Sequence, residues 1–385
     1  MSISFLFVLP NNGNGQCFLN TTTNQYETAT GEPCTNTIIT AVPFLRIAPD
    51  ARSAGMGDAG IATSADASAL HFNASKLAFA KDKVGFGLTY TPWLRALESN
   101  DTLSNNYHLG YVSGYFKIDP LNTVGLSVRY FLLGEVIFTD ENGVPISNGK
   151  PSEWEFNASY ARKFSQNFSG GFGLKYIYSN LGDGIPGIDA GTAIAMDFSF
   201  TYQTPILTIG LAATNLGQRI TYTSSINQDF LPANLGLGIA WNKQLNENNK
   251  LTLTTDINKL LAPTPDPAGT DANFDGVPDY KQRSYLSSVF GSFSDASGGF
   301  SEEFRELMFS FGMEFQFQDF LAFRTGYFTE HSTKGGREYL TTGLGYTYKF
   351  ITLNGSYLKA INQLNSPLDN TFRVSLLFAF NNQNS

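Results

Sequence analysis

The sequence has little charge, few histidines and no long hydrophobic run, and each shortage excludes a class of protein. Charged residues make up 15% of the chain, against about 25% in an ordinary soluble protein. Its apolar runs fall far short of the ~20 residues that a membrane-spanning helix needs. The formal net charge of −8 argues against nucleic acid as a partner, because surfaces that bind nucleic acid are basic.

The three histidines, His71, His108 and His331, lie far apart in sequence. A lipase of the outer membrane would need a histidine beside a serine nucleophile, and no convincing arrangement of that kind is present. The sequence therefore predicts no catalytic residues and no enzymatic activity.

Cysteine is also scarce, because Cys17 and Cys34 are the two in the chain and both precede the first predicted strand. Both could be free, but in an oxidising periplasm a disulfide that closes this small loop is favoured. The start of the chain resembles a truncated signal-peptide core without a basic region or a cleavage motif. Either the start is misassigned or this stretch is a remnant, and we expect an export signal in the complete precursor.

Aromatic residues and glycine are abundant, with 33 Phe, 18 Tyr and 37 Gly. Apolar residues recur at every second position, as in residues 124–132, where Gly125, Ser127 and Arg129 separate them. Side chains alternate across a strand, so each such strand has one apolar and one polar face. In an outer-membrane barrel the apolar face meets lipid and the polar face lines the lumen. The pattern predicts an all-β transmembrane barrel.

Fourteen alternating segments can be counted, an even number as expected for a bacterial single-chain barrel. Tight turns alternate with longer connections, as expected for periplasmic turns and external loops. On this interpretation both termini lie on the periplasmic side. The predicted strands are 83–93, 107–118, 122–134, 152–164, 167–180, 190–203, 206–215, 232–244, 249–260, 303–317, 320–331, 338–349, 351–361 and 370–380.

Residues 41–80 have neither the alternation of a strand nor the stripe of a long helix. They are too polar to span a membrane and too rich in small residues to form a domain core. We interpret them as a plug that enters the barrel lumen from the periplasmic side. The predicted organisation is a signal remnant and periplasmic disulfide segment (1–40), the plug (41–80), a 14-stranded antiparallel transmembrane β-barrel (81–380) and a polar tail (381–385).

Charged side chains in a plug need partners, because an unpaired buried charge is costly. The polar faces of the strands can supply them. One interpretation is a structural latch that holds the plug, and the alternative is a gate that responds to a ligand or cargo. The predicted network comprises Arg46, Asp50, Arg52, Asp58 and Asp66 in the plug with Arg129, Asp256 and Arg373 on strands.

The long connection 261–302 carries an acidic motif with oxygen-bearing residues at alternate positions and a glycine after the third. Ca²⁺ prefers six to eight oxygen ligands in a turning loop, so the motif predicts a calcium site, although a solvated acidic turn is the alternative. The twelfth position lacks the glutamate of an EF-hand. The predicted ligands are Asp271, Asn273, Asp275, Val277 and Asp279.

The same connection is rich in phenylalanine, notably Phe290, Phe293 and Phe300. Exposed aromatic side chains can form a surface that binds a partner. The alternative is that they pack the connection onto the barrel rim.

Fourteen strands with an N-terminal plug resemble the FadL family of long-chain fatty-acid transporters. Residues 62–77 correspond to the small-residue pattern of that family's plug, but Asn73 is followed by Ala74 where the family has proline. A closer likeness lies in FLRIAPDARSAGMGDAG at 44–60. That run resembles the PorV (LptO) family of outer-membrane proteins of the type IX secretion system of Bacteroidetes, and the likeness extends over roughly 41–380.

The PorV resemblance implies a multi-pass protein in the outer membrane of a Gram-negative bacterium. It also implies an adaptor that takes cargo with a C-terminal signal domain from the SprA/Sov translocon to the PorU attachment complex. Its partners would then be these proteins and membrane lipid. Calcium, which the acidic motif and not this resemblance predicts, is the one candidate cofactor. The wider FadL likeness implies the alternative, a channel for hydrophobic small molecules.

Overall fold

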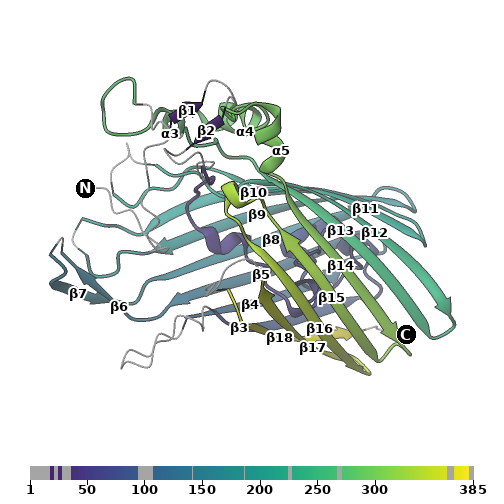
Figure 1. Ribbon diagram of the computed structural model, residues 1–385. Helices are drawn as coiled ribbons and strands as arrows, with labels where there is room; N and C mark the ends of the chain where they lie inside the picture. The colour runs from purple at the N-terminus through teal and green to yellow at the C-terminus, as the bar shows by residue number, and fades with distance from the viewer. Residues whose placement is uncertain are drawn as a thin grey trace.

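In the computed structural model, fourteen antiparallel strands close into a barrel, as the sequence predicted (Figure 1). The last strand, β18, pairs with the first, β3, so the sheet has no free edge. The structure describes residues 18–20, 25–27, 36–93, 107–140, 142–185, 187–223, 228–266, 271–361 and 368–380.

The barrel strands agree closely with the predicted segments, because strict alternation marks the length of each strand and the face to which each side chain points. In β10, for example, Ala193 and Ala195 are buried while Ile194 and Phe198 are exposed. The strands are β3 (Val84–Pro92), β4 (Tyr107–Lys117), β5 (Asn122–Leu133), β8 (Ser152–Lys163), β9 (Phe168–Asn180), β10 (Gly191–Gln203), β11 (Leu207–Gly217), β12 (Asn234–Asn246), β13 (Asn249–Leu260), β14 (Met308–Phe317), β15 (Leu321–Thr329), β16 (Glu338–Tyr348), β17 (Ile351–Ala360) and β18 (Thr371–Phe380).

The connections between strands hold further elements, most of them at the end with the long connections. A hairpin of β6 (Val136–Thr139) and β7 (Pro145–Gly149) joins β5 to β8. Three short helices precede β14, and the last of them occupies the start of the predicted strand 303–317, which therefore begins later, at Met308. These helices are α3 (Asp279–Gln282), α4 (Tyr285–Gly291) and α5 (Phe300–Arg305), and η4 (Ser332–Lys334) follows β15.

The plug, residues 41–80, folds into short turns of helix inside the barrel: η1 (Pro43–Arg46), α1 (Ala51–Ala54), α2 (Ala69–Phe72) and η2 (Ala74–Phe79). Side-chain caps start two of these turns, because Asp50 accepts from the Ser53 amide and Asn73 from the Ser75 amide. No helix within the described residues is long and apolar enough to cross a membrane.

The plug runs in the direction opposite to the one that we predicted. The Asn36 amide donates to the Thr333 carbonyl at 3.1 Å, and the Ala41 amide to that of Phe230 at 2.9 Å. Both acceptors belong to long connections. Lys83, after the plug, instead donates to Phe380 at the short-turn end (3.2 Å). Chain 36–80 therefore descends the lumen from the long-connection end.

The periplasmic placement of residues 1–40 is accordingly wrong for the part of them that the structure describes. The strands β1 (Phe18–Asn20) and β2 (Gln25–Glu27) also lie at the long-connection end, while the C-terminus lies at the opposite one (Figure 1). The error has a physical reason. Loop lengths orient the strands, but they do not specify which way a segment without strand structure crosses the lumen.

Candidate functional site: the plug and its seat in the barrel

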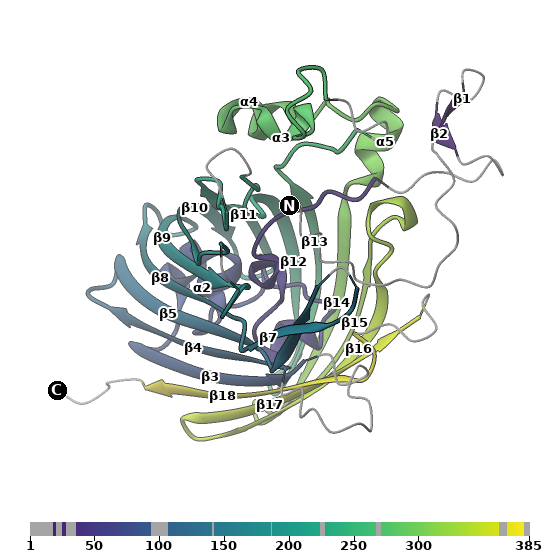
Figure 2. The same ribbon diagram turned by 90° about the vertical axis from the view of Figure 1, so that its left-hand side faces the viewer.

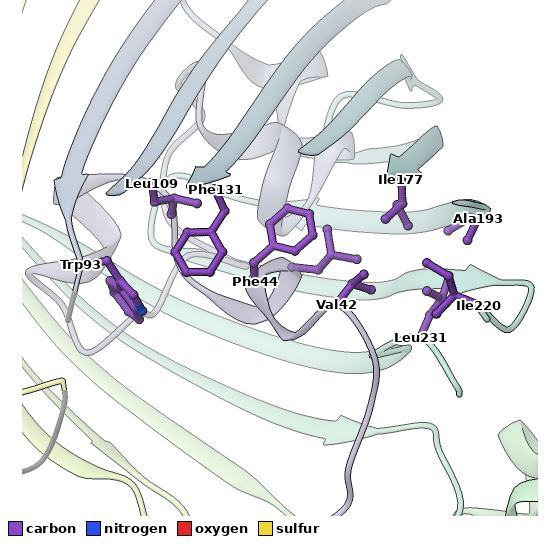
Figure 3. Packing of buried hydrophobic residues seen from close by; sticks show 11 residues of the cluster. Val42, Phe44, Trp93, Leu109, Phe131, Ile177, Ala193, Ile220 and Leu231 are labelled. Atoms are coloured by element: carbon purple, nitrogen blue, oxygen red, sulfur yellow. The ribbon is translucent and has the colours of Figure 1, made fainter. Parts of the chain in front are cut away.

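The first part of the plug packs against an apolar patch on the inner wall (Figure 3). The rings of Phe44 and Phe131 stack with centroids 6.3 Å apart and an interplanar angle of 12°. Val42 lies in the same cluster, with Ile177 and Leu231. The inner face here is apolar rather than polar, because it meets plug side chains instead of water.

Arg52 is the centre of an ionic cluster in the middle of the plug. Its Nε and Nη2 donate to the two carboxylate oxygens of Glu314 in β14, at 2.9 and 2.8 Å. Its Nη1 donates to Asp66 at 3.0 Å. Arg324 of β15 donates from Nε to Glu314 at 2.7 Å. Two guanidinium groups thus share one buried carboxylate, which ties the plug to neighbouring strands.

Arg129 of β5, which is 1% exposed, binds the plug through its backbone. It donates to the carbonyls of Phe44 at 3.0 Å and Ile47 at 3.2 Å, and it also contacts Nδ1 of His71. Its Nε lies 3.6 Å from Glu155. The sequence predicted that Arg129 would contact the plug, but it did not predict the contacts with the two carbonyls and His71. Every residue has a backbone carbonyl, so the sequence does not show which carbonyl an arginine will bind.

Three further charges of the predicted network, one on a strand and two in the plug, make different contacts. Asp256 of β13 accepts from the amides of Gly60 and Ile61, at 2.7 and 2.8 Å. Asp58 accepts from the Tyr339 hydroxyl and lies 3.9 Å from Arg373 of β18. Asp50 differs from the prediction, because its carboxylate caps α1 rather than pairing with a strand charge.

Arg46 lies at the long-connection end of the plug, where it shares Glu330 with Arg337. Its Nη2 is 3.8 Å from Glu330, whereas Arg337 binds the same carboxylate at 2.8 Å. Burial raises the pKa of Glu330, but the two guanidinium groups outweigh it and hold that pKa below its usual value. Burial and the nearby Arg337 lower the pKa of Arg46 to about 10.

Glycines on the inner wall let the plug backbone approach the strands. Gly57 has a φ of +67°, and a Cβ there would lie 2.6 Å from the Tyr327 carbonyl oxygen. A Cβ on Gly326 of β15 would lie 2.0 Å from the Gly57 nitrogen. A side chain at either position would collide with backbone, so the plug has one close-fitting seat.

The predicted charge network did not include Lys76, which is buried in the structure, with 3% of its surface exposed. Its ammonium group contacts the Gly60 carbonyl and lies 3.3 Å from the Thr63 hydroxyl, so it joins two parts of the plug. A cavity of about 110 Å³ remains beside the plug. Charged and apolar side chains both line it, among them Arg46, His71, Phe72, Lys175, Leu260 and Tyr339.

The acidic motif in the long connection forms a tight turn. Asp271 accepts from the Gly276 amide at 2.8 Å, and Asp275 accepts from the Val277 amide at 2.8 Å. Gln282, at the twelfth position, donates to Asp275 (3.1 Å) and to the Val277 carbonyl (2.8 Å). The oxygens of the motif therefore accept hydrogen bonds from backbone and side-chain amides of the same turn. The described residues hold no group of three or more His, Cys, Asp or Glu fit for a metal, and calcium binding stays a prediction.

The three phenylalanines predicted to bind a partner are exposed: Phe290 is 72% exposed, Phe293 48% and Phe300 87%. Phe293 also contacts the barrel, because the Lys259 ammonium group lies 5.9 Å from the centre of its ring. The predicted disulfide between Cys17 and Cys34 lies outside the described residues.

Comparison with known proteins identifies both a family and a fold. A family model described as "Type IX secretion system protein PorV" matches residues 30–267, and no curated protein matches the chain. The toluene transporter TbuX of Ralstonia pickettii is similar in structure, with 14% identity, a TM-score of 0.54 and coverage of 86% of this chain and 98% of TbuX. The monoaromatic hydrocarbon channel CymD is also similar, with 14% identity, a TM-score of 0.53 and coverage of 87% of this chain and 98% of CymD. These two structures share the barrel fold with this chain.

Proposed function

This chain belongs to the PorV family of the type IX secretion system, and from that premise we propose that it is an outer-membrane adaptor for secreted cargo. It receives cargo that carries a C-terminal signal domain from the SprA/Sov translocon and passes that cargo to the PorU attachment complex. The proposal includes no catalytic step.

The observation that supports an adaptor over a channel is the way the plug fills the lumen. Contacts with the barrel hold the plug at several points along its length. Arg46 and Arg52 form ion pairs with Glu330 and Glu314, and the Gly60 amide donates to Asp256. The neighbouring cavity of about 110 Å³ is smaller than the ~150 Å³ cavity that holds one benzene molecule in another protein. A barrel with a plug held in its lumen can act on cargo from its external surface without passing solute.

The alternative function is a channel for hydrophobic small molecules. TbuX and CymD are described as a toluene transporter and a monoaromatic hydrocarbon channel, but at this identity they share the fold alone. Phe72 and Leu260 do give the cavity an apolar part. Transport would still require the plug to move, since Arg46 and Lys175 line the same cavity.

The adaptor proposal can be tested by purification from native membranes. An affinity tag can be inserted after Gly143, at the tip of the β6–β7 hairpin, where an added Cβ would meet no atom within 4 Å. We expect the tagged protein to recover the translocon, the attachment complex and cargo that carries the signal domain. An unrelated outer-membrane barrel with the same tag is the control.

Cargo lacking its C-terminal signal domain should be lost from the purified complex while the translocon remains. Recovery of neither translocon nor cargo, from cells in which the tagged protein supports normal secretion, would exclude the adaptor. Saturable uptake of an aromatic hydrocarbon by vesicles that contain the purified protein would instead favour the channel.

A further inference from the structure

Helix α4 has the reverse of the usual pattern for a surface helix, because its polar side chains are buried and its apolar ones are exposed. Ser288 and Ser292 are fully buried. Leu286 and Phe290 are 66% and 72% exposed, and Phe293, just beyond the helix, is 48% exposed. Their spacing of four and three residues places them on one face. Such a face would be unfavourable in water, so apolar surface from outside the chain is needed to cover it.

The next helix, α5, also has exposed apolar side chains. In α5, Phe300 is 87% exposed and Phe304 is 57% exposed, and their spacing of four residues again gives one face. We call Leu286, Phe290, Phe293, Phe300 and Phe304 the aromatic face. It combines five large apolar side chains from two consecutive helices, more than the single exposed residues that are normal on a soluble surface.

The connection with the aromatic face is fastened to the outer side of the barrel. Lys259 of β13 is two residues beyond Ile257 and three beyond Asp256, which binds the plug from inside, so its side chain leaves the strand on the outer side. Its ammonium group binds Glu303 of α5 at 2.9 Å and Glu306 at 2.6 Å. Figures 1 and 2 both show α4 and α5 outside the ring of strands.

The part of the aromatic face on α5 is continuous with the wall that faces the membrane. The ring of Phe304 lies 6.3 Å from that of Phe309, which lies 6.5 Å from Phe311, and Phe311 lies 6.5 Å from Tyr327. Phe309 and Phe311 belong to β14 and Tyr327 to β15, on the outer face of the barrel. A row of aromatic rings therefore leads from α5 down to the surface that contacts lipid.

We propose that the aromatic face is seated in the outer leaflet of the membrane, where lipid acyl chains cover Leu286, Phe290, Phe293, Phe300 and Phe304. Aromatic side chains gather at the interfaces of outer-membrane barrels, and a short helix with an apolar face lies flat in this region. The buried charges of Lys259, Glu303 and Glu306 keep the helices against the wall. A lipid surface fits this face better than a protein, because the lipid-facing wall already continues into it.

This inference rests on the outer-membrane barrel and not on the adaptor function, so the two can fail separately. It is tested with the purified full-length protein in phosphatidylcholine vesicles, where no protein partner is present. Phe290→Trp and Phe300→Trp each place a fluorophore on the aromatic face. Val144→Trp is the control, since Val144 is 57% exposed in the turn of the β6–β7 hairpin, which is separate from that face. The unsubstituted protein, with its three tryptophans, supplies the spectrum to subtract.

We expect the added emission of Phe290→Trp and Phe300→Trp to lie at shorter wavelength than that of Val144→Trp. Brominated acyl chains in the vesicles should quench most of it while leaving the control nearly unchanged. Equal quenching of all three variants, or none, would overturn the proposal, and the second result would leave a protein as the occupant. Heat-modifiable gel mobility verifies that each variant is folded before its spectrum is read.

Discussion

Arg52 of the plug and Glu314 of β14 form a two-point ion pair across 262 positions of sequence, with N–O distances of 2.9 and 2.8 Å. A bidentate pair of this kind fixes orientation as well as distance. Arg324 binds the same carboxylate from β15, so the pair connects the plug to two strands at once. The plug is therefore held in one register, and its retention can be tested at this position.

Arg52→Ala should loosen the plug. Removing one partner of a buried pair leaves an uncompensated charge, which costs roughly 3–5 kcal/mol, although Arg324 moderates the effect on Glu314. We expect faster proteolysis of residues 41–80 in the purified variant and unchanged heat-modifiable mobility of the barrel. Arg52→Lys, which keeps the charge but loses the two-point contact, should give an intermediate rate.

The same variants distinguish a latch from a gate when cargo secretion is measured in cells. If the plug is a latch, secretion should fall only as far as the amount of folded protein falls. Arg46→Ala and Arg52→Ala proteins that fold normally but secrete no cargo would contradict the latch and favour a gate.

Gly326→Ala should prevent the plug from seating. The added methyl group would lie 2.0 Å from the Gly57 nitrogen, and overpacking against backbone costs at least ~1–3 kcal/mol. We expect ion conductance of the variant in planar bilayers to rise above that of the unsubstituted protein. Gly355→Ala in β17 is the control, because its Cβ would meet no atom within 4 Å. Equal conductance in the two variants would show that the plug does not depend on this contact.

Acid should release the long-connection end of the plug. Because the pKa of Glu330 in the folded protein lies below its ordinary 4.5, its stabilising contribution is complete above pH 4.5 and is lost as the pH falls through the folded value. We expect hydrogen exchange in residues 43–47 to show equal protection at pH 7 and pH 5, after correction for intrinsic rates, and less at pH 3. Glu330→Gln should lower protection at pH 7 and pH 5 and leave it nearly unchanged at pH 3, where Glu330 itself is neutral. A loss already at pH 6 would point to another group.

Calcium should order the acidic turn if the prediction from the motif is right. Extracellular calcium modules bind in the range of roughly 10⁻⁴–10⁻³ M. At millimolar Ca²⁺ we therefore expect slower proteolysis of residues 271–283 in the full-length protein, and no effect of Mg²⁺. Asp275→Asn should abolish the protection, while Asp319→Asn, in a distant turn, should leave it intact. Protection that is the same with and without Ca²⁺ would exclude a calcium site here.

The sequence by itself determined the barrel. Alternating apolar residues specify strands because successive side chains point to opposite faces. Once fourteen strands close into a barrel, outward-facing residues such as Val124 and Leu126 must contact lipid. The ends of β8 and β18 were predicted within a residue for the same reason. The sequence also showed that Arg52 and Arg129 would need partners, since a charge in the lumen cannot remain unpaired at low cost.

Tertiary structure alone decided how the plug is placed. No pattern within residues 41–80 shows whether the plug enters the lumen from the end with the long connections or from the end with the short turns. The plug contains no strand whose neighbours would set its direction. Three features depend on segments that are distant in sequence. They are the close approach of Gly57 to Gly326, the sharing of Glu330 by Arg46 and Arg337, and the ion pairs of Lys259 with α5. Such contacts arise from the closure of the barrel around the plug, and a linear pattern does not encode them.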